Sequence, residues 1–133
     1  MSTSAATHPR LTAAVPQFSV SDVLATVQYY RDRLGFFVGD VVADPPEWGA
    51  VGRDGVELFF NRLPAGATGH PRIRALGAYD AYFRVTGVDQ LAADFRARGA
   101  VIREGPVDRD YDVREVVVED LNGLVLAFGE SKT

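Results

Sequence analysis

The sequence contains no cysteine and no long apolar segment, and each absence excludes a class of structure or function. Without cysteine the protein has no disulfide, no thiolate metal site and no cysteine nucleophile, which fits a reducing compartment. No stretch approaches the roughly 18 consecutive apolar residues of a membrane span, and the amino-terminal segment lacks the apolar core of a secretory signal. We therefore expect a soluble, cytoplasmic protein without a membrane partner.

Positive charge is also scarce. Lys and Arg total 14 against 18 Asp and Glu, which gives a formal net charge of -4 and a pI near 5.1. Nucleic-acid-binding domains usually carry a basic stripe, so this balance predicts no nucleic-acid partner. An acidic protein instead favours a neutral or cationic small ligand.

Side chains for nucleophilic catalysis are few. Beyond the amino-terminal segment serine occurs only at Ser19, Ser21 and Ser131, and the two histidines, His8 and His70, each precede a proline in an expected loop. No nucleophile has a base near it in a recognisable pattern. We therefore predict no catalytic residues and no cofactor.

A duplicated strand and helix dominate what is present. Residues 14–35 read as a strand followed by a helix that stops at glycine, and residues 79–99 repeat that pattern. Three pairs of anchor positions are each 65 residues apart, namely Val20 and Val85, Val23 and Val88, and Tyr30 and Phe95. A chain of this length forms one domain that buries about 68% of its unfolded surface, so we expect the two copies to pack together.

Each copy continues into three further strands. The first helix is expected to begin at Ser21 or Asp22 and to end at Gly35, and the second to span 86–98. Strands are expected at 14–20, 36–42, 48–53, 56–62, 79–85, 101–104, 113–119 and 124–128, with tight turns at 54–55 and 122–123 and a charged loop at 105–110.

This order predicts an α+β fold of paired βαβββ modules. The predicted divisions are an N-terminal tail at 1–12, a first module at 13–62, a crossover linker at 63–78 and a second module at 79–130. One module cannot cover both faces of its sheet, so we expect a curved mixed sheet around a concave cavity, with the helices outside. The alternative is that the enclosed space is only a packed core.

Four stretches carry a resemblance to a known family: VPQFSVSDVLATVQYYRDRLGF, RDGVELFF, YFRVTGVDQLAADFRARGA and YDVREVVVEDLNGLVLAFGE. Over residues 13–130 the chain resembles the vicinal oxygen chelate superfamily of glyoxalases, bleomycin-resistance proteins and extradiol dioxygenases. The last stretch departs from the family hairpin at Asp112, where glycine is usual, and at Leu121, where proline is usual. The resemblance implies the fold and no single chemistry, because one fold hosts many functions.

Enzymes of this family hold a divalent metal with four side chains, usually His or Glu, from the first and last strands of each module. The resemblance carries these positions over to Val15, Glu57, Asp80 and Ala127, and a two-residue shift would put Phe59 in the place of Glu57. At most two of these side chains offer an oxygen ligand, and none is histidine. The resemblance therefore implies a lost metal site.

Within the family the chain most resembles the small bleomycin-resistance type, whose members are dimers that hold a toxic natural product between subunits. We therefore expect a metal-free homodimer that confers resistance by sequestering a bulky, partly aromatic antibiotic, of bleomycin type or another DNA-damaging product. The strand faces opposite the helices combine aromatic and polar side chains, as small-molecule sites do. The predicted ligand-binding residues are Gln17, Phe37, Trp48, Glu57, Phe59, Asp80, Tyr82, Arg84 and Tyr111.

Several of these predictions have alternatives. Trp48 can stack on a planar ligand or cover the edge of the core, and Asp80 can anchor a cationic ligand or lie in water at a strand start. Arg84 can contact a ligand or form an ion pair within its sheet. For the whole protein, one alternative is a glyoxalase-like metal-dependent lyase or isomerase, or a dioxygenase, that uses Glu57 as metal ligand or general base; another is a ligand-sensing or scaffold protein.

Overall fold

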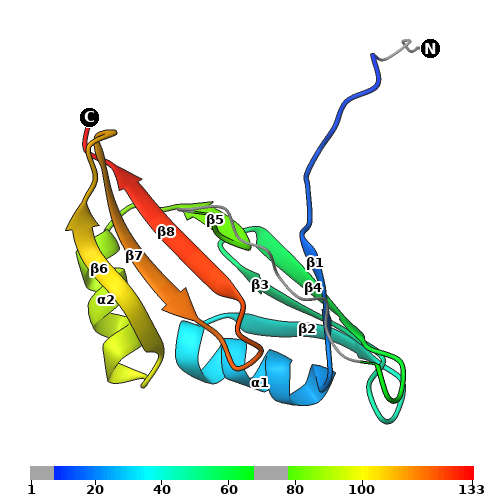
Figure 1. Ribbon diagram of the computed structural model, residues 1–133. Helices are drawn as coiled ribbons and strands as arrows, with labels where there is room; N and C mark the ends of the chain where they lie inside the picture. The colour runs from blue at the N-terminus through cyan, green and yellow to red at the C-terminus, as the bar shows by residue number, and fades with distance from the viewer. Residues whose placement is uncertain (1–7, 68–77) are drawn as a thin grey trace.

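The computed structural model describes residues 8–67 and 78–133. The first half contains β1 (Gln17–Val20), α1 (Val23–Leu34), β2 (Phe37–Val42), β3 (Trp48–Arg53) and β4 (Val56–Arg62). The second half contains β5 (Ala81–Arg84), α2 (Val88–Ala97), β6 (Val101–Asp108), β7 (Val113–Glu119) and β8 (Val125–Ser131). The predicted α+β fold of two βαβββ modules is confirmed (Figure 1). Most of the predicted crossover lies outside the described residues.

The strands form two curved, open sheets of four strands each. Their orders are β1-β4-β3-β2 and β5-β8-β7-β6, so the two modules have the same topology. In both, the first strand pairs in parallel with the last: Gln17 lies opposite Phe59, and Tyr82 lies opposite Ala127. The predicted curved mixed sheet is present as two mixed sheets, one from each module.

The two helices begin in different ways. Of the two predicted caps of α1, Ser21 and Asp22, the structure has Asp22, whose Oδ1 accepts the backbone N–H of Ala25 at 2.9 Å. Gly35 ends the helix as predicted, in the left-handed region at φ 73°. The second helix starts two residues later than predicted and has no side-chain cap of its own. Glu130 on β8 supplies one instead, accepting the N–H groups of Gly87 at 2.9 Å and Val88 at 3.0 Å.

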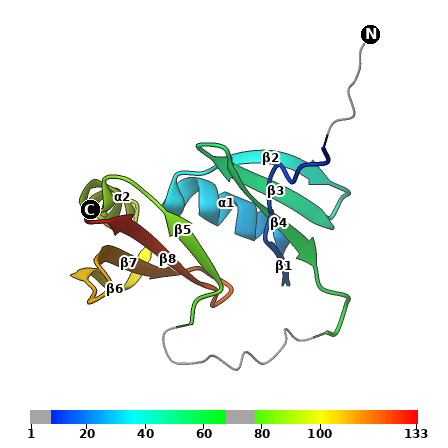
Figure 2. The same ribbon diagram turned by 90° about the horizontal axis from the view of Figure 1, so that it is seen from above.

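One hydrophobic core runs through both modules. Each helix lays its apolar stripe on its own sheet, with Val23, Val27 and Tyr30 buried on α1 and Val88, Ala92 and Phe95 buried on α2. Across the junction the rings of Phe36 and Phe83 meet edge to face at a centroid distance of 6.4 Å. Figure 2 shows the modules side by side, with the β7–β8 hairpin beside α1.

The predicted loop at 105–110 is wrong, because β6 continues to Asp108. Gly105 has φ 94°, and the register with β7 shifts on either side of Glu104. Pairing then resumes, with Val107 opposite Glu115 and Asp108 opposite Arg114. An edge strand with a bulge can carry many charged side chains, because one edge and one face of the strand are in contact with water. The charged composition of this segment therefore resembled that of a loop.

No helix within the described residues is long and apolar enough to cross a membrane.

Candidate functional site

Each sheet has one face covered by a helix and one open face. On the first sheet, alternation along β3 and β4 buries Val51, Leu58 and Phe60 toward α1 and leaves Trp48, Glu57 and Phe59 on the open face. On the second sheet, Tyr82 and Arg84 of β5 stand on the open face, beside Glu115 of β7. These open faces hold most of the predicted ligand-binding residues.

The first open face carries an aromatic pair and a shallow hollow. Trp48 is half-buried and tilts against Phe59, with ring centroids 4.8 Å apart, so it packs on the sheet face while keeping part of its ring exposed. At the other end of this face, Phe37 and Glu57 border a hollow of about 330 Å³. Phe37 is 80% exposed, which is unusual for so large an apolar side chain.

Gln17 also lies on this face, at its β1 edge. The side-chain oxygen of Gln17 accepts a hydrogen bond from Asn61 Nδ2 at 3.4 Å. The five predicted residues of the first module therefore share one surface that has an aromatic centre and polar edges.

The second open face is organised around Glu115, a residue that the sequence did not single out. Its side chain is fully buried, yet it comes from the middle of β7 on the face opposite α2. The carboxylate accepts hydrogen bonds from Tyr111 at 2.7 Å, Tyr82 at 2.8 Å, Arg109 at 2.8 Å and Tyr79 at 3.4 Å. We call these five residues the Glu115 cluster.

The electrostatics of the cluster keep Glu115 charged. Burial alone would raise its pKa, but the hydrogen bonds from Tyr111, Tyr82 and Arg109 outweigh burial, so the pKa lies below its usual value. Burial and the hydrogen bond to this carboxylate raise the pKa of Tyr82 to about 12 and that of Tyr111 to about 12. The phenols therefore stay neutral donors, and their rings are held in fixed positions.

The cluster covers the sheet with aromatic surface that remains partly in water. Tyr82 is 42% exposed and Tyr111 55% exposed, although both hydroxyls bind a buried group. Tyr79 packs on Val117, Val125 and Ala127 beneath it. Glycine at position 129 is needed here, because a Cβ at that position would collide with the Tyr82 hydroxyl. The result is a preorganised aromatic wall.

The structure separates the nine predicted residues into two groups. Gln17, Phe37, Trp48, Glu57 and Phe59 lie on the first sheet, and Asp80, Tyr82, Arg84 and Tyr111 belong to the second module. Asp80 has a structural bond, because its Oδ2 accepts the N–H of Val125 at 2.8 Å at the start of β8. Tyr111 lies in the short turn between β6 and β7. A hydrogen bond of 2.8 Å from the N–H of Arg109 to the carbonyl of Val113 closes this turn.

Sequence reasoning missed Tyr79, Arg109 and Glu115. A signal was present, since the segment from Arg109 to Glu115 holds an aromatic and both charge signs beside a run of valines. A glutamate inside such a strand needs partners. Arg109 and Tyr111 come from the same segment, whereas Tyr79 and Tyr82 come from another segment that only the fold brings close.

The positions that would hold the family metal do not fit one. The strand register puts Phe59 and Ala127 in equivalent places, opposite Gln17 and Tyr82, so the two-residue shift applies and Phe59 rather than Glu57 corresponds to Ala127. Asp80 instead donates its backbone N–H to the carbonyl of Val125, and its side-chain Oδ2 accepts the N–H of Val125. Among residues 8–67 and 78–133 no three side chains of His, Cys, Asp or Glu gather as metal ligands.

Comparisons with known proteins agree on the fold. The chain resembles TioX from Micromonospora sp. ML1, with a TM-score of 0.72, 18% sequence identity, and coverage of 90% of this chain and 98% of that one. It also resembles TnmS3, an antibiotic-binding protein from Streptomyces sp. CB03234, with a TM-score of 0.68, 20% identity, and coverage of 93% and 99%. A glyoxalase/bleomycin resistance protein/dioxygenase from Nocardioides gives a TM-score of 0.67 at 17% identity, with coverage of 94% and 86%.

A search of curated proteins gave no match. The sequence profile of the glyoxalase/bleomycin resistance protein/dioxygenase superfamily, in contrast, matches residues 12–128, which is nearly the whole chain. That match spans both modules, both open faces and the Glu115 cluster. The chain therefore belongs to the glyoxalase/bleomycin resistance protein/dioxygenase superfamily.

Proposed function

We propose that this protein binds and sequesters a bulky, partly aromatic antibiotic, of bleomycin type or another DNA-damaging natural product, without a metal. The observation that carries the proposal is the pair of aromatic open faces in a superfamily scaffold whose metal positions correspond to Val15, Phe59, Asp80 and Ala127, which offer at most one oxygen ligand. Large rigid rings give contact area at low entropic cost, which suits a binding protein. The similarity to TnmS3, which is described as an antibiotic-binding protein, supports the same class of ligand.

The two faces supply complementary parts of such a site. Trp48 and Phe59 provide a stacking surface for a planar group, and Glu57, which is exposed, provides a carboxylate for a cationic one. Tyr82 and Tyr111 provide a second aromatic wall whose hydroxyls are already committed to Glu115. The net charge of -4 favours a neutral or cationic ligand.

A homodimer is part of the proposal. The nine predicted residues lie on two sheets, and each sheet leaves its face open. In a twofold dimer the first open face of one subunit can oppose the second open face of the other, which encloses a ligand twice per dimer. The family resemblance supports this arrangement.

Titration of the purified protein with bleomycin, and with a panel of other aromatic DNA-damaging antibiotics, tests the proposal. Since Trp48 is the single tryptophan, its fluorescence should be quenched, with saturation at two ligands per dimer. Ligand at about 100 times Kd should add about 2.7 kcal/mol to the free energy of unfolding. If no compound in the panel quenches Trp48 or shifts the melting temperature, the proposal is wrong.

Two variants locate the site. Trp48→Ala should weaken binding about tenfold or more, measured by calorimetry, because a stacked aromatic anchor is lost. Leu24→Ala is the matched control, since Leu24 is an apolar side chain that is 45% exposed on α1, away from both open faces. Equal affinity in the two variants would contradict the assignment of the site.

The enzyme alternative makes a different prediction. Stoichiometric metal in the purified protein, together with turnover of methylglyoxal and glutathione after addition of nickel, zinc or manganese, would replace sequestration by a glyoxalase-like activity. Glu57→Ala then separates two roles. Loss of antibiotic binding without any bound metal identifies Glu57 as a ligand anchor.

A further inference from the structure

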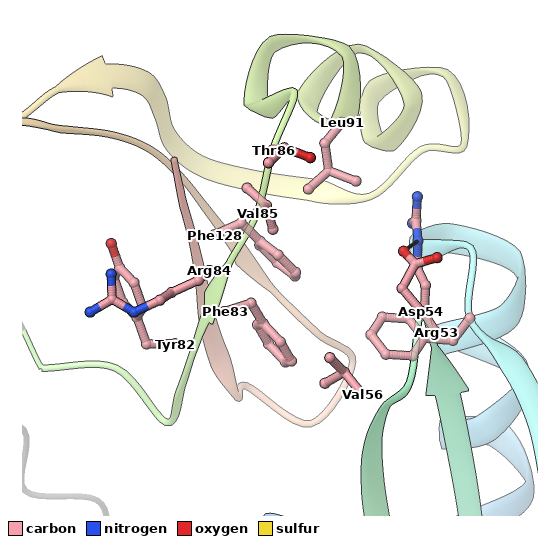
Figure 3. A pocket seen from close by; sticks show the side chains of 11 residues that line it. Arg53, Asp54, Val56, Tyr82, Phe83, Arg84, Val85, Thr86, Leu91 and Phe128 are labelled. Carbon is pink, nitrogen blue, oxygen red and sulfur yellow. Dashed lines mark ion pairs between the residues drawn. The ribbon is translucent and has the colours of Figure 1, made fainter. Parts of the chain in front are cut away.

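A cleft of about 660 Å³ lies at the junction of the two modules, between the tip of the β3–β4 hairpin and the surface formed by β5 and α2 (Figure 3). Its volume is within the range of pockets for drug-sized molecules, about 300 to 1,000 Å³. It adjoins the second open face, because Tyr82 and Arg84 border both, but its other lining residues lie outside the two open faces. Figure 3 shows Phe83 and Val85 on the cleft side of β5, whereas Tyr82 and Arg84 extend from the other side of that strand.

The cleft originates in a difference between the two modules. The β3–β4 turn has two residues, Asp54 and Gly55, and the β7–β8 connection has five, from Asp120 to Leu124. The longer connection reaches α1, where Asp120 accepts the Tyr30 hydroxyl at 2.7 Å and Asn122 Nδ2 donates to Thr26 Oγ1 at 3.1 Å. The shorter turn stops before α2.

Equivalent side chains of the two modules differ in how far they are exposed, as this difference in hairpin length predicts. The strand register makes Leu124 the counterpart of Val56, and Leu124 is completely buried while Val56 is 44% exposed. On the helices, Thr26 is completely buried but its counterpart Leu91 is only half-buried. The second module thus lacks the cover that the first receives, and apolar surface is left open to solvent.

The walls of the cleft are aromatic and aliphatic. Phe83 stacks on Phe128 with ring centroids 4.7 Å apart and an angle of 11° between the ring planes, and Phe36 meets Phe83 edge to face. Leu91 and Val56 complete the apolar lining. A flat aromatic molecule could extend this row of rings by stacking, in the offset or edge-to-face geometry that aromatic groups prefer.

The charged groups at the hairpin side of the cleft, Arg53 and Asp54, balance each other. Arg53 donates to the carbonyl of Leu34 at 2.8 Å and pairs with Asp54 at 3.6 Å, so its charge is already matched. Arg84 and Tyr82 also border the cleft, but Figure 3 shows their polar ends on the other side of β5. Thr86, whose hydroxyl can donate or accept one hydrogen bond, is the remaining polar side chain of the lining. A charged ligand would lose hydration here without gaining a partner.

We propose that this cleft is a second ligand site, which takes a neutral, flat aromatic molecule carrying at most one or two hydrogen-bonding groups. The proposal is based on the different lengths of the two hairpin connections and on the row of rings formed by Phe36, Phe83 and Phe128. It does not depend on antibiotic binding at the open faces.

Fluorescence titration with N-phenyl-1-naphthylamine, a neutral aromatic dye that brightens in apolar surroundings, tests the site. The dye should bind the intact protein with one site per chain. Leu91→Trp, which fills the cleft from α2, should weaken binding at least tenfold. Gln90→Trp is the matched control, because Gln90 is the exposed neighbour of Leu91 on the same helix, and this variant should bind the dye like the original protein.

A second change closes the cleft from the other side. Replacing Asp54-Gly55 by the five residues of the β7–β8 connection, Asp-Leu-Asn-Gly-Leu, should also abolish dye binding, with folding checked by circular dichroism. Unchanged dye affinity in both Leu91→Trp and the longer hairpin overturns the proposal. The proposal is also wrong if Trp48→Ala weakens dye binding and Leu91→Trp does not. It is wrong as well if the dye binds only to a dilute monomer, because a second copy of the chain would then cover the cleft.

Discussion

Glu115 is the residue on which the second open face depends. A carboxylate with no exposed surface is costly unless every lone pair is occupied, and three tyrosines and Arg109 provide the partners. The cluster therefore couples a charge in the sheet to the positions of the aromatic rings above it. The same residues that stabilise the module also shape the proposed ligand wall.

Glu115→Gln should lower the free energy of unfolding at neutral pH by about 2 to 4 kcal/mol, because charge-assisted hydrogen bonds are lost and Arg109 stays paired only with Glu104. The folded-state pKa of Glu115 is lowered, so its stabilisation is complete above the unfolded value of about 4.3 and is lost as the pH falls through the folded value. Urea unfolding should be measured from about pH 7 to about pH 3. The difference in the free energy of unfolding between the original protein and Glu115→Gln should become smaller as the pH falls.

The tyrosines give an independent readout of the same change. In the original protein Tyr82 and Tyr111 each have a pKa of about 12. Phenolate absorbance in Glu115→Gln should show both pKa values falling part of the way toward about 10, because burial still raises them while the hydrogen bond and the charge of Glu115 are gone. An unchanged phenolate titration, or a stability difference that does not vary with pH, would contradict the proposed role of Glu115.

At the scale of elements, the two hairpins differ more than the helices do. The β7–β8 connection ties the modules together through Asp120, whose carboxylate accepts the Tyr30 hydroxyl and the backbone N–H groups of Asn122 and Leu124. Burial raises the pKa of Asp120, and these hydrogen bonds partly offset the effect. The shorter β3–β4 hairpin makes no equivalent bond to α2, which leaves the cleft at the junction.

Tyr30→Phe tests the contribution of this bond between modules. The ring should still fit, since Phe95 is completely buried at the equivalent position of α2. Loss of the 2.7 Å bond to buried Asp120 should lower the free energy of unfolding by about 1.5 to 3 kcal/mol, measured by urea denaturation. Tyr29→Phe is the control, because its 3.3 Å bond to the carbonyl of Glu119 is partly exposed and should contribute about 1 kcal/mol or less. Equal losses in the two variants would argue against a special role for the Asp120 bond.

At the scale of the whole molecule, the open faces are the basis of the proposed homodimer. Monomeric proteins rarely expose contiguous aromatic surface, and Phe37, Tyr82 and Tyr111 all stand partly or mostly in water. The protein should therefore sediment with about twice the mass of the 14.4 kDa chain. Phe37→Asp should shift this equilibrium toward monomer if Phe37 lies in the interface, whereas Leu24→Asp on α1 should not. A monomer at all accessible concentrations would contradict the dimer.

Prediction from sequence was most complete where local signals agree. The cap at Asp22, the glycine stop at Gly35 and the turn at Asp54-Gly55 each depend on neighbouring residues, and all three are present in the structure. The loop expected at 105–110 failed because a bulged edge strand and a charged loop have the same composition. The cap of α2 by Glu130 could not be found locally, because the partners are more than forty positions apart, with 43 between Gly87 and Glu130.

The sequence by itself determined the duplicated βαβββ plan, since helix and strand periodicity and the 65-residue spacing are properties of the chain. Tertiary structure alone decided which side chains meet. It enclosed Glu115 among Tyr79, Tyr82, Tyr111 and Arg109, placed Phe59 rather than Glu57 in the position equivalent to Ala127, and opened the cleft beside α2. The physical reason is that burial and hydrogen bonding of a polar group depend on what several distant segments bring to it, whereas periodicity depends only on neighbours in the chain.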